Sequence, residues 1–328
     1  MTITSASAPD RPRLVADVGG TNARFGWQQQ AGGEIVDVST LPCADYASLS
    51  DAIVAYLAKV GRNTPPDCAI AIANPVTGDE VRMTNHHWAF SISALKAQCG
   101  FERLRVLNDF TALALALPHL PADELRQVGG GAPVAGTPIA LIGPGTGLGV
   151  SGLVPDGRGG WIALEGEGGH ATLGGRTERE TAVLRQIDAL YGHASGERAV
   201  SGQGLIDVYE ALLEIDSPGA SVPAMSAAQI VHGALDERNA ACLEAVDLFC
   251  AFLGTAAGNL ALTLGARAGV YIGGGIVPRL GDAFAQSPFR SRFEAKGRFE
   301  GYLAAIPVYV IHAKQSPALL GAASALGT

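Results

Sequence analysis

The stretch RVLNDFTALALALP, residues 105–118, combines the end of a strand with the start of a helix. Val106 and Leu107 are typical of a buried strand, and an apolar run with helical spacing follows the polar pair Asn108 and Asp109. Asn and Asp are favoured at helix N-caps, so this pair predicts a turn from strand to helix. The turn also places a carboxamide and a carboxylate at the carboxyl end of a strand, where α/β folds bind ligands. From this stretch alone, Asp109 is either a helix cap or a functional carboxylate.

Two glycine-rich hairpins lie on either side of this stretch. In the first, residues 14–18 and 23–27 predict two strands around the turn Gly19-Gly20-Thr21-Asn22, and double glycine between β-rich segments is typical of a hairpin. In the second, residues 139–142 and 150–154 flank the turn GPGTGLG, residues 143–149. The same pattern in each half of the chain indicates a duplicated architecture.

Glycine turns of this kind can bind phosphate through backbone N–H groups that no side chain covers, and Thr21 and Asn22 add donors to the first turn. The carboxylate of Asp17, just before that turn, has the wrong charge for phosphate, so we expect a bridging Mg²⁺. The alternative is an ordinary hairpin without a ligand. Within the second hairpin, residues 147–152 match GxGxxG, but residues 153–157 continue as strand and turn instead of opening a helix, which argues against a dinucleotide fold.

A third polar cluster is EGEGGH, residues 165–170, with two carboxylates and a histidine spaced by glycines. Carboxylates accept from vicinal hydroxyls and histidine can donate or accept, so the cluster favours polyol recognition over a metal site. A solvated loop is the alternative. Glu197, and the glycine run 273–275 after an apolar strand, are weaker signals that read as surface and turn when taken alone. His86 and His87 receive no chemical role.

The remaining pattern predicts a mixed sheet with helices in each half. In the first half we expect a third strand at 34–41, a helix at 46–60, a strand at 69–73, a turn-rich segment at 74–88 and a helix at 93–99. Residues 118–138 read as a surface connection. In the second half we expect a strand at 161–164, helices at 178–191, 202–214, 227–233 and 236–264, strands at 269–272 and 306–311, and a final helix at 317–326. The last strand and the last helix are expected to return and pack on the first lobe.

Composition limits the class of protein. The chain has 328 residues, 48% hydrophobic and 16% charged, with 43 glycines and a net charge of −8. No basic block exists, so no nucleic-acid partner is expected. Five cysteines without a CxxC spacing favour a reducing compartment over a disulfide framework or zinc site. The most apolar stretch, 246–266, contains Asp247 and Asn259, so we expect a buried core helix and no membrane association.

Taken together, eight segments in this order resemble the bacterial ATP-dependent glucokinases of the hexokinase-like superfamily, from about Leu14 to the C-terminus. The segments are LVADVGGTNARF, GDEVRMTNHHWAFS, LNDFTALALALP, GPGTGLGVSGLV, EGEGGHATL, ERAVSGQGL, GGGIVPRL and KGRFEGYLAAIPVYVI. The resemblance implies an α/β, two-lobed actin-like or hexokinase-type fold built from ribonuclease H-like repeats, with the ligand cleft between the lobes. We expect a disordered lead at 1–12, a small lobe at 13–118 plus about 312–328, and a large lobe at 119–311.

The resemblance also assigns roles to the motifs. It implies that Asp109 is the catalytic base, and that the hexose is bound by Asn108, Asp109, Glu167, His170 and Glu197. It implies that Asp17 binds Mg²⁺ through water. It also implies that ATP is bound by Ala16, Asp17, Val18, Gly19, Gly20, Thr21, Asn22, Thr146, Gly147 and Gly274. Residues 171–176 lack the cysteines that hold structural zinc in related sugar kinases, so no structural zinc is expected.

The expected activity is therefore transfer of the γ-phosphoryl group of ATP to the 6-hydroxyl of D-glucose by a cytoplasmic homodimer. Other hexoses remain open as substrates: mannose, fructose or an N-acetyl amino sugar. Two other classes are a non-catalytic sugar-sensing regulator and an actin-like ATPase. The first would carry a DNA-binding segment or lack the base, and the second would not need the cluster at 165–170.

Overall fold

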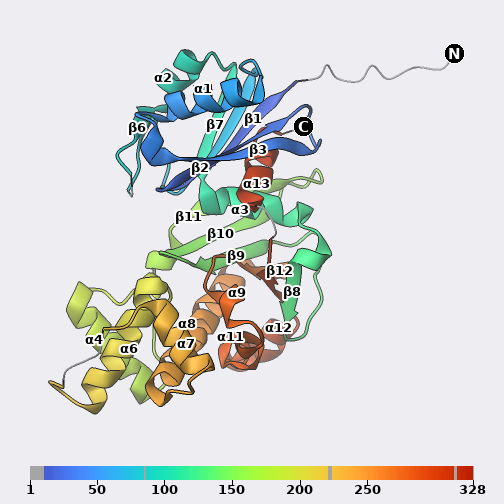
Figure 1. Cartoon of the computed structure of the whole chain (residues 1–328). Coiled ribbons are helices and arrows are strands. Elements are labelled where there is room, and N and C mark those ends of the chain that lie inside the picture. The colour runs from blue at the N-terminus through green and yellow to red at the C-terminus, as the bar shows by residue number, and fades with distance from the viewer. Residues whose placement is uncertain (1–10, 85, 221–223, 314–315, 328) are drawn as a thin grey trace. The chain divides into compact units, whose positions relative to one another are not determined.

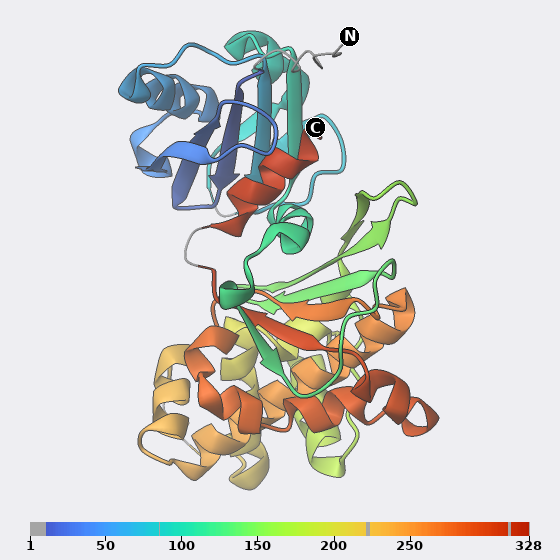
Figure 2. The same cartoon turned by 90° about the vertical axis from the view of Figure 1, so that its right-hand side faces the viewer.

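The computed structural model describes residues 11–84, 86–220, 224–313 and 316–327. The chain forms two compact units, Met1–Leu120 with Ala313–Thr328 (unit 1) and Pro121–His312 (unit 2), which Figures 1 and 2 show from two directions. Residues 1–10 of the predicted lead lie outside the described part of the chain. Arg11 is ordered, because its guanidinium binds the carboxylate of Asp67.

Unit 1 is built on a five-stranded sheet in the order β3-β2-β1-β4-β7. The first three strands form an antiparallel meander, and β4 and β7 are parallel to β1 because helices connect them. The strands are β1 (Arg13–Val18), β2 (Asn22–Gln28), β3 (Ile35–Pro42), β4 (Asp67–Ile72) and β7 (Arg103–Asn108). A short antiparallel pair, β5 (Glu80–Arg82) and β6 (Ala89–Ser91), lies outside this sheet.

Helices cover both faces of the sheet of unit 1. Alternation along β1 directs Leu14, Ala16 and Val18 toward a core shared with α1 (Leu49–Val60) and α2 (Ile92–Cys99). Val15 points to the opposite face, where α3 (Asp109–Ala116) and α13 (Pro317–Ala325) pack. Figure 2 shows the red α13 against this face of the sheet, so the C-terminal helix returns to the first unit, as the sequence predicts. The prediction that the strand at 306–311 returns with it is wrong, because that strand pairs within the sheet of unit 2.

Unit 2 repeats the arrangement of unit 1. Its six-stranded sheet has the order β11-β10-β9-β12-β13-β8, in which β9, β10 and β11 form an antiparallel meander and β12 and β13 follow in parallel. The strands are β8 (Leu125–Val128), β9 (Ile139–Pro144), β10 (Leu148–Pro155), β11 (Trp161–Gly166), β12 (Gly269–Ile272) and β13 (Val308–Ile311). Five strands in the same order and sense in both sheets confirm the duplicated architecture that the glycine hairpins indicate.

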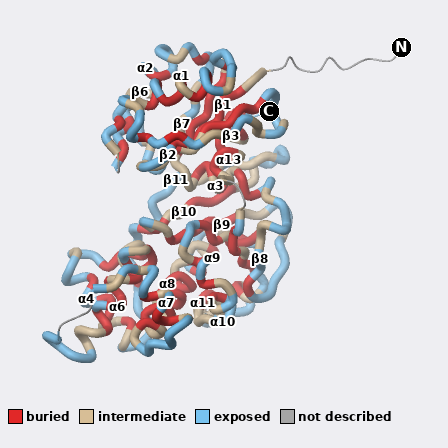
Figure 3. The backbone as a smooth tube through the Cα atoms, viewed as in Figure 1, coloured by how far each residue is buried: buried red, intermediate tan, exposed pale blue. Residues whose placement is uncertain are grey.

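The helices of unit 2 surround α8 (Ala240–Leu264), whose buried residues include Phe249, Phe252 and Leu253. Within the described residues, α8 is the one helix long and apolar enough to cross a membrane, and more than half of its apolar stretch is buried in the unit. Figure 3 shows the buried backbone of both units in red. The other helices are α4 (Glu178–Tyr191), α5 (Gly196–Ala199), α6 (Gly202–Asp216), α7 (Ala227–Leu235), α9 (Val277–Leu280), α10 (Asp282–Gln286), α11 (Phe289–Glu294) and α12 (Glu300–Ala304).

The short 3₁₀ turns complete the described secondary structure. They are η1 (Cys43–Asp45), η2 (Leu117–His119), η3 (Ala122–Glu124), η4 (Gly168–His170) and η5 (Gly297–Phe299).

Some sequence-based predictions are wrong in detail. The connection predicted at 118–138 contains β8, an edge strand of only four residues, too short for alternation to reveal it. The turn-rich segment 74–88 contains β5, which has three residues and is also too short for alternation to reveal it. The helices predicted from residues 46 and 236 begin at Leu49 and Ala240, because Ser48 and Asn239 cap them. Residues 277–304 form four short helices where we predicted none.

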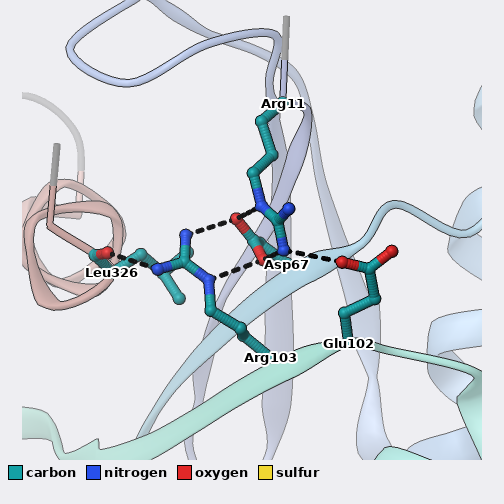
Figure 4. A network of polar contacts seen from close by, with 5 residues as sticks. All are labelled: Arg11, Asp67, Glu102, Arg103 and Leu326. Atoms are coloured by element: carbon teal, nitrogen blue, oxygen red, sulfur yellow. Dashed lines mark hydrogen bonds and ion pairs between the residues drawn. The ribbon is translucent and has the colours of Figure 1, made fainter. Parts of the chain in front are cut away.

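A buried carboxylate ties both ends of the chain to the sheet of unit 1. Asp67 is fully buried, and Arg11 (2.7 and 2.9 Å) and Arg103 (2.8 and 2.5 Å) both bind its two oxygens (Figure 4). Arg11 also donates to Glu102, and Arg103 donates to the carbonyl of Leu326 just after α13 (3.3 Å). Burial alone would raise the pKa of Asp67, but the hydrogen bonds from the two guanidinium groups outweigh it and hold the pKa well below its usual range.

Candidate active site

The turn from β7 into α3 presents two polar side chains with different tasks. Asn108 is the N-cap, and its Oδ1 accepts from the N–H groups of Phe110 (2.8 Å) and Thr111 (3.3 Å). Its Nδ2 donates to the carbonyl of Asn74 (3.4 Å). Asp109 is the first residue of the helix, and its Oδ1 accepts from the N–H of Phe110 (2.9 Å). Asn108 is therefore the cap, and the Oδ2 atom of Asp109 has no hydrogen bond within the residues that the structure describes.

Asp109 has the electrostatic character of a proton acceptor. Burial and, to a smaller extent, the negative charge of Asp17 raise the pKa of its carboxyl group to about 6, against the opposing effect of the N–H of Phe110. A carboxylate of this kind is ionised at neutral pH yet more basic than an ordinary aspartate. Such tuning is typical of general bases.

Asp17 stands beside the first glycine hairpin on the face of the sheet that α3 and α13 cover. Its Oδ2 accepts a hydrogen bond from the Oγ of Ser316 (2.5 Å) and lies 3.6 Å from the Nη1 of Arg24. An open pocket of about 290 Å³ follows the hairpin. The pocket is lined by Asp17, Gly19, Gly20, Thr21, Asn22 and Arg24.

Gly19 and Gly145 have no structural reason to be glycine. A Cβ on Gly19 would approach no nearer than 3.7 Å to the protein, and a Cβ on Gly145 would meet nothing within 4 Å. Neither residue has a positive φ, so the backbone conformation does not require glycine either. Close approach of a ligand to the backbone is the remaining reason, and it agrees with phosphate binding at both hairpins.

The corresponding hairpin of unit 2 lies against a carboxylate. Its turn is closed between Pro144 and Leu148, and the Oε2 atom of Glu197 accepts from the N–H of Leu148 (2.9 Å). A Cβ on Gly147 would lie 2.4 Å from the same oxygen, so glycine here makes room for Glu197. Glu197 belongs to α5, which the sequence analysis read as a loop. Unit 2 thus brings together a predicted sugar ligand and a predicted phosphate turn.

The cluster at 165–170 reaches the same place. Glu167 precedes the turn η4 and His170 is its last residue, and their exposed side chains make no hydrogen bond within the described chain. A Cβ on Gly169 would lie 2.1 Å from the carbonyl of Leu148, and one on Gly196 would lie 3.2 Å from the carbonyl of Gly169. The glycines therefore let η4, α5 and the hairpin pack backbone to backbone, leaving carboxylates and an imidazole free to bind hydroxyls.

Gly274 has a structural role that accompanies its predicted place near the nucleotide. Its φ is 79°, and a Cβ would lie 2.2 Å from the carbonyl of Pro144 at the end of β9. The turn after β12 is thus held against the base of the second hairpin.

The predicted site residues divide between the two units. Unit 1 holds Ala16, Asp17, Val18, Gly19, Gly20, Thr21, Asn22, Asn108 and Asp109, and unit 2 holds Thr146, Gly147, Glu167, His170, Glu197 and Gly274. The sequence pattern does not reveal that Arg24 and Ser316 contact the carboxylate of Asp17. Arg24 is one strand away, but Ser316 is 299 residues distant, and no local pattern could connect it. Among the described residues, no group of three metal-binding side chains is present.

Two sheets of the same topology, each with a glycine hairpin suited to phosphate, define a phosphotransferase of the actin-like, hexokinase-type fold. The family model named Glucokinase matches residues 14–328. The sequence is 56% identical over 315 residues to a glucokinase of Chromobacterium violaceum, covering 96% of this chain and 89% of that one. It is 50% identical over 329 residues to a glucokinase of Neisseria gonorrhoeae, covering 100% and 98%. A crystal structure of glucokinase from an Antarctic psychrotroph matches with a TM-score of 0.88 at 36% identity, covering 96% and 98%. The chain belongs to the glucokinase family.

Proposed function

We propose that this protein transfers the γ-phosphoryl group of ATP to the 6-hydroxyl of D-glucose, with Asp109 as the base. The single observation that carries the assignment of the base is the carboxylate of Asp109, half-buried at the carboxyl end of β7, with a pKa raised to about 6 and Oδ2 open. Membership of the glucokinase family supports the reaction and the substrate.

The proton moves in the step that forms the new bond. The 6-oxygen of glucose attacks the γ-phosphorus and loses its proton to Oδ2 of Asp109, while the bond from the γ-phosphorus to the β–γ bridging oxygen breaks and ADP leaves. Such transfers need positioning and charge neutralisation more than covalent catalysis. A base in this place contributes about 10²- to 10⁴-fold.

The sugar hydroxyls are assigned to the polar groups that the protein itself leaves open. Among the described residues, Oε1 of Glu197 has no hydrogen bond while the N–H of Leu148 donates to Oε2, and Asn108 has one amide hydrogen left after it donates the other to the carbonyl of Asn74. The side chains of Glu167 and His170 are exposed and make no hydrogen bond to the described residues, so both can bind sugar hydroxyls. A hexose with a misplaced hydroxyl would leave one of these groups unpaired, which is the physical basis of discrimination between epimers.

Magnesium fits the first hairpin. Asp17 presents one carboxylate to the pocket, and a single carboxylate with phosphate oxygens and waters is a donor set that Mg²⁺ accepts. When bound there, Mg²⁺ would neutralise charge on the phosphates. Since the described residues contain no three-ligand cluster, we expect the ion to arrive with the nucleotide. Dialysis against EDTA should therefore abolish activity until Mg²⁺ returns and leave the melting temperature unchanged; a collapse of the melting temperature would reveal a structural metal.

We propose that the protein is a homodimer and that it is located in the cytoplasm. The five cysteines are all free thiols, which supports a reducing compartment. Light scattering coupled to gel filtration tests the assembly, and a mass near that of one chain would contradict it.

A panel of hexoses tests the substrate. Formation of ADP is measured with glucose, mannose, fructose and N-acetylglucosamine, each at saturating ATP and Mg²⁺. We expect glucose to have the highest kcat/KM. A higher value for another hexose would reassign the substrate. Formation of ADP at a rate that no hexose changes would reassign the class to an actin-like ATPase.

A further inference from the structure

Ser316 stands at a position where serine ordinarily caps its own helix. It is the N-cap residue of α13, and Pro317 follows at the first helical position. A serine hydroxyl at an N-cap normally accepts from an N–H one turn into the helix. In α13 no such hydrogen bond forms. The hydroxyl of Ser316 instead donates to Oδ2 of Asp17 over 2.5 Å. The hydroxyl of Ser316 therefore contacts Asp17 and does not cap α13.

This contact selects one oxygen of the Asp17 carboxylate. The Nη1 of Arg24 lies 3.6 Å from the same Oδ2, so both polar neighbours act on one side of the group. Within residues 11–84, 86–220, 224–313 and 316–327, no hydrogen bond or ion pair reaches Oδ1. Asp17 also lines the pocket along the first hairpin. A carboxylate fixed through one oxygen can present the other in a single direction.

The helix that carries Ser316 is itself firmly placed. Gly321 of α13 packs directly on α3, where a Cβ would lie 1.7 Å from the carbonyl oxygen of Ala112. Ala318 and Leu319 are buried against the sheet beside Val15, on the face toward which Asp17 also points. The hydroxyl of Ser316 therefore reaches Asp17 from a packed element, and α13 connects the end of β1 with the helix that begins at Asp109.

We propose that Ser316 is a positioning residue for Asp17: its hydroxyl holds Oδ2 so that Oδ1 faces the phosphate-binding pocket and receives the hydrated Mg²⁺ of the nucleotide. This role rests on the proposed function, in which Asp17 binds that ion. It gives the C-terminal segment of the chain a part in nucleotide binding, although it lies 299 residues from Asp17 in sequence.

Three variants separate positioning from simple support of the fold. Ser316→Ala removes the donor. Ser316→Asn keeps a side-chain donor on a residue that is also favoured at N-caps. Ser324→Ala is the matched control, because Ser324 lies on the same helix and its hydroxyl, within the part of the chain that the structure describes, donates only to the carbonyl of Leu320. Melting temperatures of all three identify any variant that has lost its fold.

The decisive measurement is the affinity for Mn²⁺ in the presence of ADP, followed by electron paramagnetic resonance without turnover. A hydrogen bond to a charged group is strong enough that its loss should weaken Mn²⁺ binding by about tenfold in Ser316→Ala. In the kinetic assay the concentration of Mg²⁺ for half-maximal rate should rise by a similar factor, while KM for glucose stays unchanged. Ser316→Asn should recover most of the affinity, and Ser324→Ala should match the wild type.

The outcomes distinguish the two levels of the proposal. If the wild type does not phosphorylate glucose, the proposed function fails. If the wild type is active but folded Ser316→Ala binds Mn²⁺ as the wild type does, or Ser324→Ala weakens it equally, the positioning role is wrong. Should Ser316→Ala not fold, folded Ser316→Asn with wild-type Mn²⁺ affinity supports the role, and a tenfold loss in that variant contradicts it.

Discussion

At the scale of single residues, the carboxyl group of Asp109 combines two properties that a helix cap does not need. It is partly buried next to a second carboxylate, Asp17, and one of its oxygens is free within the described chain. The capping itself is done by Asn108. Of the two interpretations of the stretch 105–118, the cap belongs to Asn108, and this leaves the carboxylate of Asp109 for the proposed chemistry.

The raised pKa of Asp109 predicts a pH dependence. The carboxyl group must be ionised to accept a proton, so kcat/KM for glucose should rise with pH to a plateau, with an apparent pKa of about 6 for the enzyme before glucose binds. Below that value the rate should fall tenfold per pH unit. The profile is measured at saturating ATP and Mg²⁺ over pH 4.5 to 8.5. A limb centred near the ordinary aspartate value of about 4 would show that burial does not tune this group.

Asp67 predicts a stability effect remote from the chemistry. Asp67→Asn leaves two guanidinium groups without their common carboxylate at a buried position, but both arginines are half-exposed, so we expect a loss of about 2 kcal/mol in the free energy of unfolding rather than the full cost of a buried pair. Because the pKa of Asp67 is lowered in the folded state, this stabilisation is present above the unfolded pKa of about 4 and is lost as pH falls further.

Urea unfolding at pH 7 and pH 3 measures that difference. The matched control is Glu102→Gln, which removes only the exposed contact with Arg11 and should change the unfolding free energy by less than about 0.5 kcal/mol. Equal effects of the two substitutions would contradict the importance of the buried carboxylate.

At the scale of elements, the contact between α3 and α13 holds the helix that carries Asp109. Gly321→Ala would place a methyl group 1.7 Å from the carbonyl oxygen of Ala112, and because backbone cannot yield as a side chain does, the helices must separate. We expect a loss of about 1–3 kcal/mol, as for other overpacked cores, together with reduced kcat. Thermal unfolding and steady-state kinetics test both effects.

Gly301→Ala is the matched control for that substitution. Gly301 lies in α12, where a Cβ would meet nothing within 4 Å and φ is not positive, so alanine should be neutral or stabilise by about 0.4–1 kcal/mol. If Gly321→Ala were equally harmless, the close approach of α3 and α13 would not be a real constraint.

Elements with strong local patterns could be predicted from the sequence, and those defined by distant contacts could not. The two glycine hairpins, the caps and the long helices have their causes within a few residues, and they gave the duplicated sheet. Strand β8 is fixed by pairing with β13, more than 180 positions later, and the helices of 277–304 are too short to show a period. At the candidate site, the sequence pattern singles out Asp109 and Asp17 and leads to their proposed roles, but it gives no sign of the neighbours of Asp17, because Ser316 comes into contact with it only by folding.

At the scale of the whole molecule, the two units repeat one strand order and hold different members of the predicted set of site residues. Unit 1 holds the proposed base Asp109 and the pocket lined by Asp17. Unit 2 holds the second hairpin, with Glu197 against it and Glu167 and His170 at the neighbouring turn η4. Both hairpins follow the first strand of the five-strand pattern that the two sheets share, β1 and β9, so the duplication accounts for two glycine turns of the same kind in one chain. The carboxylates proposed to bind the sugar in unit 2 lie on the short helix α5 and at the start of the turn η4.

The central claim, that Asp109 accepts the proton of the 6-hydroxyl, is tested most directly by Asp109→Asn. The amide keeps the shape and the contact with the N–H of Phe110 but cannot take the proton. Glucose binding by isothermal titration and kcat in a coupled assay for glucose 6-phosphate are measured on the same preparation. We expect the dissociation constant for glucose to stay within about tenfold and kcat to fall by about 10²- to 10⁴-fold. A variant that binds glucose and turns over at the wild-type rate would contradict the account.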